Sequence, residues 1–377
     1  MRHLHFFVLL CSFPPSSLHW CIDMSKTNYM YPSCPQEEDK KWDCPIFNQK
    51  GYDPFIDFLK GVCIVNVVLQ HCIPYNIRFR MLFSLWGESA VPLFLLLQVY
   101  HSYKGGLDYA KVKTNKLWER ILKPFFLVQM IIIGISYFLS IGNISFVEFI
   151  LNVLRQGGLG PGSYYPWIYI QMALIISWIA PILKGGNNKL MVFAFIIISE
   201  CIEITCSLSE MPEWLYRLLF IRYFFLIYWG YMLSVKGSVL NRMTCIGSVL
   251  SAMAILYFRY SNVSLEPFFF NTNWKICHWI CYIYFVCFFL YIIRFIYDFR
   301  FFPQTIRRLV EIMGRRSYEI FLWQMAYFCI MHGFLAESFY NRLGWKWGNM
   351  CLVVFSLVIC TFPIIYDVVR KRNSRER

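Results

Sequence analysis

Ten apolar runs, each long enough to cross a lipid bilayer, follow one another along this 377-residue chain. The hydrocarbon core of a bilayer is about 30 Å thick, so a helix that rises about 1.5 Å per residue needs about twenty apolar residues to cross it. The sequence therefore predicts an all-α, polytopic integral membrane protein with about ten transmembrane helices. The runs lie near residues 57–75, 85–103, 121–141, 164–183, 189–208, 217–235, 243–260, 275–297, 317–335 and 348–367.

The composition agrees with a membrane protein and argues against a nucleic-acid partner. Hydrophobic residues make up 58% of the chain and charged residues only 15%, whereas roughly a quarter of the residues in a soluble domain are charged. The formal net charge is +14, which on its own would suit nucleic-acid binding. The Lys and Arg residues lie mainly in short loops beside the apolar runs, where they are typical of a positive cytoplasmic face.

The distribution of Lys and Arg predicts the orientation. If the first run crosses from inside to outside, the loops at 104–123, 184–189, 236–242 and 300–316 and the C-terminal tail are cytoplasmic, and they are rich in Lys and Arg. Cytoplasmic loops carry such an excess. An even number of spans then places both ends of the core in the cytoplasm. Far fewer basic residues fall on the outer side: Arg78, Arg80, Arg155, Arg217, Arg259, Lys275, Arg342 and Lys346.

The first 52 residues differ from the rest of the chain. The apolar stretch 4–13 is too short to span a bilayer, and its small residues are poorly placed for signal-peptide cleavage. We expect residues 1–52 to be a disordered or mis-annotated N-terminal extension, with Met24 or Met30 as an alternative start. Residues 53–370 then form the transmembrane domain, and residues 371–377 a basic cytoplasmic tail.

Cysteines and histidines give no sign of a metal site. Most of the 15 cysteines lie within apolar runs, where they behave as small hydrophobic residues, and no C-x-x-C pair occurs. No span carries two histidines three or four residues apart. We therefore expect no bound metal.

The first run carries three polar side chains on one stripe. Lys60 and His71 are eleven residues apart, which at 100° per residue is about three turns plus roughly 20°. Asp57 falls within about 40° of the same line. Taken singly, Asp57 can cap the helix, Lys60 can reach the cytoplasmic surface and His71 can sit at the outer interface. Together they favour a polar channel in which His71 acts as a general base or nucleophile.

Other polar residues within the runs are candidates for lining such a channel. Arg294 and Asp298 are spaced as a structural ion pair on one helix. Glu200 and Glu203 share a helix face and either line a cavity or sit at an interface. The glycine-rich loop 157–162, followed by aromatic residues, either turns the chain at an interfacial aromatic belt or admits a large acceptor. The channel-lining candidates are Glu88, Gln98, Trp167, Arg222, Tyr318 and Gln324.

The first run also resembles the opening of acyltransferase family 3, in which a basic residue is followed by ten residues and then an essential His. Lys60 and His71 have this spacing. Further segments match the family in order, over about residues 53–370. They are Val91-Pro92-Leu93-Phe94, Arg120-Ile121-Leu122-Lys123-Pro124, Trp167-Ile168-Tyr169, Tyr228-Trp229-Gly230-Tyr231 and Gly314-Arg315-Arg316-Ser317-Tyr318-Glu319-Ile320-Phe321-Leu322.

Three departures bear on substrate contacts. Lys60 stands where the family usually has Arg, which keeps the charge but loses the bidentate fork. Leu97-Gln98-Val99-Tyr100 replaces the family's Ser-Gly-Tyr/Phe, and Gln324 occupies a position that is often His.

The resemblance implies transfer of an acyl group, usually acetyl from acetyl-CoA, to a hydroxyl of a cell-surface or exported glycan. Acetyl-CoA is then a donor substrate, and no permanently bound cofactor is expected. On this view Lys60, Arg120 and Lys123 bind the CoA phosphates, His71 activates the hydroxyl or carries the acyl group, and Asp57 orients a cation. The expected partners are the lipid bilayer, acyl-CoA and a glycan, and the expected location is the cytoplasmic membrane.

Two other hypotheses remain open at this stage. A transporter of a glycan or lipid-linked intermediate would also be polytopic with polar groups inside the membrane. Transporters often show two related halves or broken paired helices, and neither is visible in this sequence. A relative that has lost catalysis is a third hypothesis, suggested by Gln98 and Gln324.

Overall fold

The computed structural model describes residues 46–47, 52–104, 117–139, 145–186, 188–261 and 278–364. The chain divides into two units, residues 1–41 and 42–377, and everything below concerns the second. The proposed disorder of the extension up to residue 45 and the basic tail lie outside the described residues. Ile46 and Phe47, which we assigned to the extension, are buried: Phe47 packs on Tyr100, and Ile46 bonds the carbonyl of Gly237. These two apolar residues belong to the folded core.

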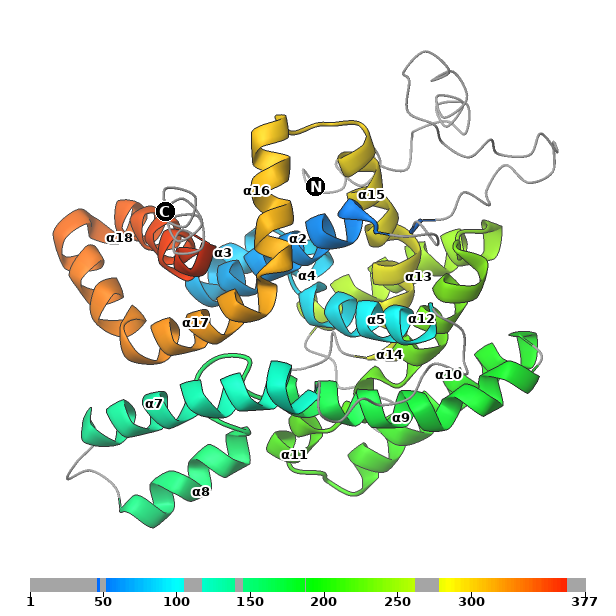
Figure 1. Ribbon diagram of the computed structural model, residues 1–377, viewed down its shortest axis with the longest axis horizontal. Coiled ribbons are helices and arrows are strands. Elements are labelled where there is room, and N and C mark those ends of the chain that lie inside the picture. The colour runs from blue at the N-terminus through cyan, green and yellow to red at the C-terminus, as the bar shows by residue number, and fades with distance from the viewer. Residues whose placement is uncertain are drawn as a thin grey trace, which may run out of the picture. The chain divides into compact units, whose positions relative to one another are not determined.

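The described residues form helices and no strand, as the sequence predicts (Figure 1). Eight of these helical stretches are long and apolar enough to cross a membrane. Four of them are single helices or parts of one: Pro54–Cys72 (α2), Tyr165–Lys184 (within α9, Tyr165–Gly185), Leu190–Leu208 (within α10, Asn188–Leu208) and Arg242–Tyr260 (α13). Three combine consecutive elements: Phe83–Tyr103 (α4, Phe83–Trp86, and α5, Ala90–Tyr103), Trp118–Phe138 (η3, Trp118–Leu122, and α7, Lys123–Leu139) and Trp279–Asp298 (α14, Trp279–Tyr284, η6, Phe285–Phe289, and α15, Leu290–Asp298). The eighth, His332–Ile364, includes α18 (His332–Cys360).

The two other predicted spans are also helical but are shorter or broken. The run at 217–235 becomes α11 (Glu213–Leu218), η4 (Phe220–Tyr223) and α12 (Phe225–Lys236), because the backbone is extended at Leu219. The run at 317–335 becomes α17 (Ser317–Ile330). The helix α18 bends at Gly344, whose φ of 72° and ψ of 170° are not helical.

Within the described residues, three shorter helices lie between the spans: α3 (Tyr75–Arg80), α8 (Phe146–Gln156) and α16 (Gln304–Arg315). Both α8 and α16 place apolar and polar residues on opposite faces, a pattern that a search for uniformly apolar runs does not detect.

Contacts between the spans agree with the alternating topology. At the predicted cytoplasmic ends, Arg294 of α15 lies 3.7 Å from Asp53 before α2, and the Tyr231 hydroxyl donates to the carbonyl of Leu183 at 3.2 Å. At the outer ends, Arg259 of α13 lies 3.4 Å from Glu88. Each contact joins ends that the topology places on the same side of the membrane.

Helix α2 is central to the bundle, and α16 packs across it (Figure 1). Two glycines permit this close crossing. A Cβ on Gly61 would lie 2.0 Å from the carbonyl oxygen of Val310, and one on Gly314 would lie 1.7 Å from that of Asp57. Because backbone atoms approach so closely, any larger side chain at either position would separate the helices.

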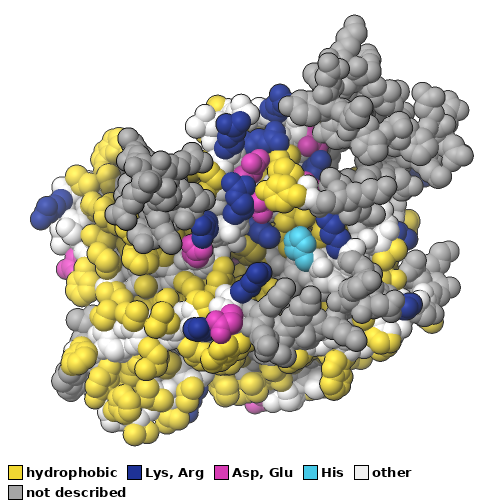
Figure 2. Space-filling model, viewed as in Figure 1, with side chains coloured by type: hydrophobic (Ala, Val, Ile, Leu, Met, Phe, Trp, Pro, Cys, Tyr) yellow, Lys and Arg dark blue, Asp and Glu magenta, His cyan; other side chains and the backbone are white. Residues whose placement is uncertain are grey.

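Apolar side chains cover most of the visible face, while Lys and Arg gather around α16 (Figure 2). The outward surfaces of α7, α10 and α13 expose residues such as Met130, Leu190 and Met243. Such surfaces are suited to contact with lipid chains, whereas α2 and α5 are largely buried within the bundle.

Candidate functional site

A cavity of about 700 Å³ lies within the bundle, and α2 forms one of its walls. Its other walls come from α5, α9, α17, the end of α16 and the loop at 157–163. It reaches from Asp57, at the predicted cytoplasmic end of α2, to His71, at the outer end. The cavity therefore joins side chains from both predicted sides of the membrane.

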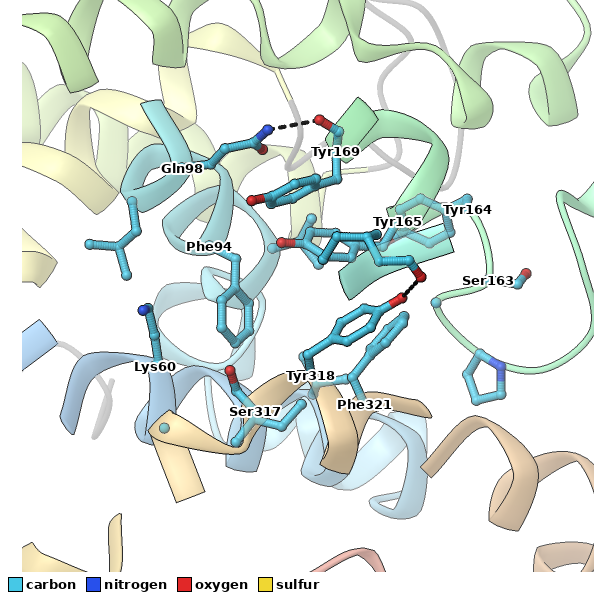
Figure 3. A pocket seen from close by; sticks show the side chains of 18 of the residues that line it. Lys60, Phe94, Gln98, Ser163, Tyr164, Tyr165, Tyr169, Ser317, Tyr318 and Phe321 are labelled. Carbon is cyan, nitrogen blue, oxygen red and sulfur yellow. Dashed lines mark hydrogen bonds between the residues drawn. The ribbon is translucent and has the colours of Figure 1, made fainter. Parts of the chain in front are cut away.

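Lys60 and His71 both line this cavity, together with Ile64 and Val67 between them. This is the shared helix face that the eleven-residue spacing predicts, and the two residues are separated by about 16 Å along the helix axis. The Lys60 ammonium makes no hydrogen bond or ion pair with any described residue, and Figure 3 shows it at the edge of the pocket. A cation without a protein partner, facing a cavity, is available to an anionic ligand.

Asp57, Arg315 and Tyr52 form the mouth at the predicted cytoplasmic end of the cavity, called the cytoplasmic mouth below. The Asp57 carboxylate accepts a hydrogen bond from the Tyr52 hydroxyl at 2.5 Å and lies 3.6 Å from Nη1 of Arg315. The bond to Asp57 raises the pKa of Tyr52. Helix α2 is capped by Asp53, whose side chain accepts from the amide of Phe55. Asp57 is therefore part of the mouth and is not the helix cap.

His71 lies at the outer end of the same wall. Its ring meets Phe328 of α17 edge-on, with ring centroids 5.6 Å apart. No described residue forms a hydrogen bond with either ring nitrogen, and the side chain is only partly buried. The imidazole can therefore meet a substrate hydroxyl within the cavity.

Aromatic side chains form the wall opposite α2 (Figure 3). The hydroxyls of Tyr165 and Tyr169 point toward the side of the cavity where Phe94, Gln98 and Lys60 lie. Neither hydroxyl is bonded to another described residue. Gln98 donates to the carbonyl of Tyr169 at 2.7 Å, which leaves its buried Oε1 without a described partner. These three polar atoms give an otherwise apolar wall its hydrogen-bonding capacity.

The glycine-rich loop 157–163 enters the bundle and is held by two glutamines. Gln129 of α7 pairs with both backbone groups of Leu159, accepting at 2.8 Å and donating at 2.9 Å. Gln324 of α17, which is fully buried, donates to the carbonyl of Pro161 at 3.1 Å. Gly160 has a φ of +88° and lies against the backbone of Met325, one helical turn from Phe328. The loop therefore lies beside the turn of α17 that contacts His71.

The outer mouth is formed by Gln156, Ser163, Tyr164 and Arg217. Nη2 of Arg217 donates to the carbonyl of Gln156 at 3.1 Å, and its guanidinium lies 5.9 Å from the centre of the Tyr164 ring. Arg217 thus brings a cation to the outer end of the cavity.

Residues 53–366 match the acyltransferase domain that defines acyltransferase family 3. The chain belongs to acyltransferase family 3. Searches of curated proteins and of solved structures give no match. Membership covers nearly the whole core, so the protein is a multi-pass membrane acyltransferase. The cavity lined by Lys60 and His71 is its candidate active site.

The sequence-derived candidates divide into those that line this acyltransferase cavity and those that do not. Asp57, Lys60, His71, Gln98 and Tyr318 line it, and the Tyr318 hydroxyl donates to the carbonyl of Ile121 at 2.6 Å. The others, among described residues, contribute elsewhere: Glu88 pairs with Arg259, Trp167 donates to the carbonyl of Gly157, Arg222 is buried among aromatic rings, and Gln324 holds the loop.

The two other expected CoA-binding cations lie on the surface. Arg120 is exposed on η3, and Lys123 is exposed and pairs with Glu119 at 3.0 Å. Their neighbour Ile121 lines the cavity. They flank the cavity without forming its wall.

Two cations that do line the cavity, Arg217 and Arg315, were absent from our sequence-based site. Arg315 lies within the Gly314–Leu322 segment that resembles the family, so its motif could have suggested it. Arg217 lies in none of the segments that resemble the family, so no motif could have suggested it. The structure also separates Glu200 and Glu203 from the cavity: Glu200 accepts from Trp279 at 2.7 Å, and Glu203 from Tyr216 at 2.6 Å.

Proposed function

We propose that this acyltransferase moves an acyl group, usually acetyl, from cytoplasmic acyl-CoA to a hydroxyl of a cell-surface or exported glycan, and that it works in the cytoplasmic membrane. The observation that carries the proposal is the single cavity that Lys60 and His71 line at opposite ends. A donor that enters near Lys60 and an acceptor that enters near His71 would meet inside it.

The cytoplasmic mouth suits an anionic donor. Lys60 forms no close ion pair with a described residue, since Asp57 acts on it only as a more distant charge. Arg315 is only partly engaged by Asp57, with 47% of its side chain exposed. The phosphates of CoA bind such cations by charge-assisted hydrogen bonds. Arg120 and Lys123, exposed beside the mouth, add positive charge that attracts the donor.

His71 would supply general-base catalysis. The imidazole accepts the proton of the acceptor hydroxyl as the hydroxyl oxygen attacks the thioester carbonyl carbon. The tetrahedral intermediate then collapses, the carbon–sulfur bond breaks, and the imidazolium returns its proton to the CoA thiolate. The acceptor leaves as an ester and His71 is regenerated neutral. In the alternative route His71 attacks first and carries the acyl group to the hydroxyl.

The negative charge on the carbonyl oxygen requires donors. The backbone N–H groups of Gly160 and Gly162 belong to the loop that lines the cavity, and no described residue accepts a hydrogen bond from them. The hydroxyls of Tyr165 and Tyr169 are equally available. Fixed donors of this kind stabilise the transition state because they need no rearrangement during the reaction.

The test uses membranes containing the full-length protein, labelled acetyl-CoA and de-acetylated surface glycan from the producing cells. The wild type should transfer label to the glycan. His71→Gln should lower transfer at least a hundredfold, within the usual range for a lost general base. His278→Gln is the matched control, because His278 is buried outside the cavity.

Two outcomes would contradict the proposal. If His71→Gln transfers at the wild-type rate, His71 has no part in the chemistry. If the wild type moves glycan across the membrane without consuming acetyl-CoA, the protein acts as a transporter. Competition by acyl-CoA donors of increasing chain length would identify the acyl group.

A further inference from the structure

Arg217 is the one Lys, Arg, Asp or Glu side chain in the outer part of the cavity wall, within the described residues. The other charged lining residues, Asp57, Lys60 and Arg315, all lie at the cytoplasmic mouth. No described acidic side chain lines the cavity at that end, although Glu213 lies close enough to act on Arg217 by its charge. An acceptor that reaches His71 from outside would therefore meet a positive charge in the cavity wall and no negative one.

The surroundings of Arg217 leave part of its guanidinium available. Nη2 donates to the carbonyl of Gln156 at 3.1 Å. Nε is buried and has no described hydrogen-bond partner. No described carboxylate lies within ion-pair distance of Arg217, and Glu213 on the same helix acts on it only as a more distant charge. Arg217 is thus fixed by one bond and by the Tyr164 ring, with donors left for a ligand.

A guanidinium in this situation binds oxyanions well. Its planar fork matches the two oxygens of a carboxylate or phosphate, and burial strengthens the interaction because less water competes. A neutral sugar hydroxyl would satisfy only one donor and leave the charge uncompensated.

Building on the proposed function, we infer that the acceptor is an acidic glycan, whose carboxylate or phosphate binds Arg217 while a nearby hydroxyl reaches His71. Arg217 then determines specificity for the acceptor and takes no part in donor binding. Acceptor binding and donor binding use different cations because Arg217 lies at one end of the cavity and Lys60 and Arg315 lie at the other.

The acceptor itself provides the first test. Surface glycan from the producing cells is de-acetylated and divided into untreated, carboxyl-reduced and dephosphorylated portions. Wild-type membranes with labelled acetyl-CoA should label the untreated portion, and removal of the relevant acid group should lower labelling at least tenfold. The portion that loses labelling distinguishes a carboxylate from a phosphate.

The second test separates specificity from a structural role. Arg217→Gln should lower kcat/KM for the untreated glycan by about ten- to a hundredfold, the range for a lost charge-assisted hydrogen bond. It should leave labelling of the neutralised glycan and the KM for acetyl-CoA unchanged, and Arg217→Lys should restore part of the activity. Arg155→Gln is the matched control, since Arg155 is exposed on α8 and does not line the cavity.

Each outcome bears on one of the two proposals. Equal labelling of neutral and acidic glycan, or an acetylated repeat without acid groups, would overturn the inference while leaving acyl transfer in place. The inference is also overturned if Arg217→Gln weakens labelling of the untreated and the neutralised glycan equally, because Arg217 would then serve only to hold the backbone at Gln156. Failure of the wild type to label any glycan contradicts the proposed function, and the inference falls with it.

Discussion

The carboxylate of Asp57 on α2 lies 3.6 Å from the guanidinium of Arg315 at the end of α16, so the cavity mouth joins two helices that are far apart in the sequence. The exposed fractions of the two side chains are 10% and 47%. Because about half of the Arg315 side chain is exposed, water screens this pair and it adds little to stability. The main effect of the contact is to hold Arg315 at the mouth.

We expect Asp57→Asn to raise the KM for the acyl donor about three- to tenfold while changing stability little. Asparagine still accepts the Tyr52 hydrogen bond but no longer attracts Arg315, so the cation becomes less ordered. Initial rates against donor concentration provide the measurement. Asp298→Asn is the control, since Asp298 pairs with Arg294 outside the cavity. An unchanged donor KM in Asp57→Asn would show that Arg315 needs no such partner.

Substitution of Lys60 tests whether its charge or its shape matters. Lys60→Met should raise the donor KM at least tenfold, because it removes a cation that faces the cavity and forms no close ion pair with a described residue. Lys60→Arg should keep near wild-type binding, because the family usually has Arg at this position. Donor binding to purified protein, followed by calorimetry, provides the measurement. Lys236→Met, at the exposed cytoplasmic end of α12, should bind as the wild type does.

The crossing of α2 and α16 depends on glycine. Gly314→Ala places a methyl group 1.7 Å from the carbonyl oxygen of Asp57, so the helices must move apart. We expect a loss of stability of about 1–3 kcal/mol or more. Thermal unfolding in detergent measures it. The control is Gly134→Ala on α7, where a Cβ meets nothing within 4 Å and stability should hold or rise slightly. Equal stability of both variants would mean that the helices do not cross so closely.

The loop at 157–163 should depend on Gln129. Gln129→Leu removes the partners of both backbone groups of Leu159, which costs about 1–3 kcal/mol for each buried group left unsatisfied. Because the loop lines the cavity beside α17, kcat should fall more than the donor KM changes. Asn349→Leu, which also loses two hydrogen bonds but lies outside the cavity, should lower stability without lowering kcat of the folded enzyme. The same fall in kcat for both variants would contradict a specific role of the loop.

Eight of the ten apolar runs correspond to helical stretches long and apolar enough to cross a membrane, because the requirement of lipid for length and apolarity acts on each segment independently. The runs at 217–235 and 317–335 are helical but broken or shorter. The same method did not predict α8 and α16, whose apolar residues occupy only one face. It also did not predict the break at Leu219, where Gln171 of α9 donates to the carbonyl of Leu218 and accepts from the amide of Phe220. The Arg294–Asp298 pair was correctly predicted, since its spacing lies within one helix.

The sequence by itself determined the fold class and the stripe of Asp57, Lys60 and His71, because each of these follows from composition or from spacing within one segment. The orientation stays a prediction from the Lys and Arg content of the loops. Only the tertiary structure decided which other side chains meet that stripe. Arg315 and Arg217 join the cavity wall, Gln324 holds a loop 163 residues away, and Glu88 turns to Arg259. Helical periodicity specifies the direction of a side chain about its own axis, but the partner it meets depends on how separate helices pack.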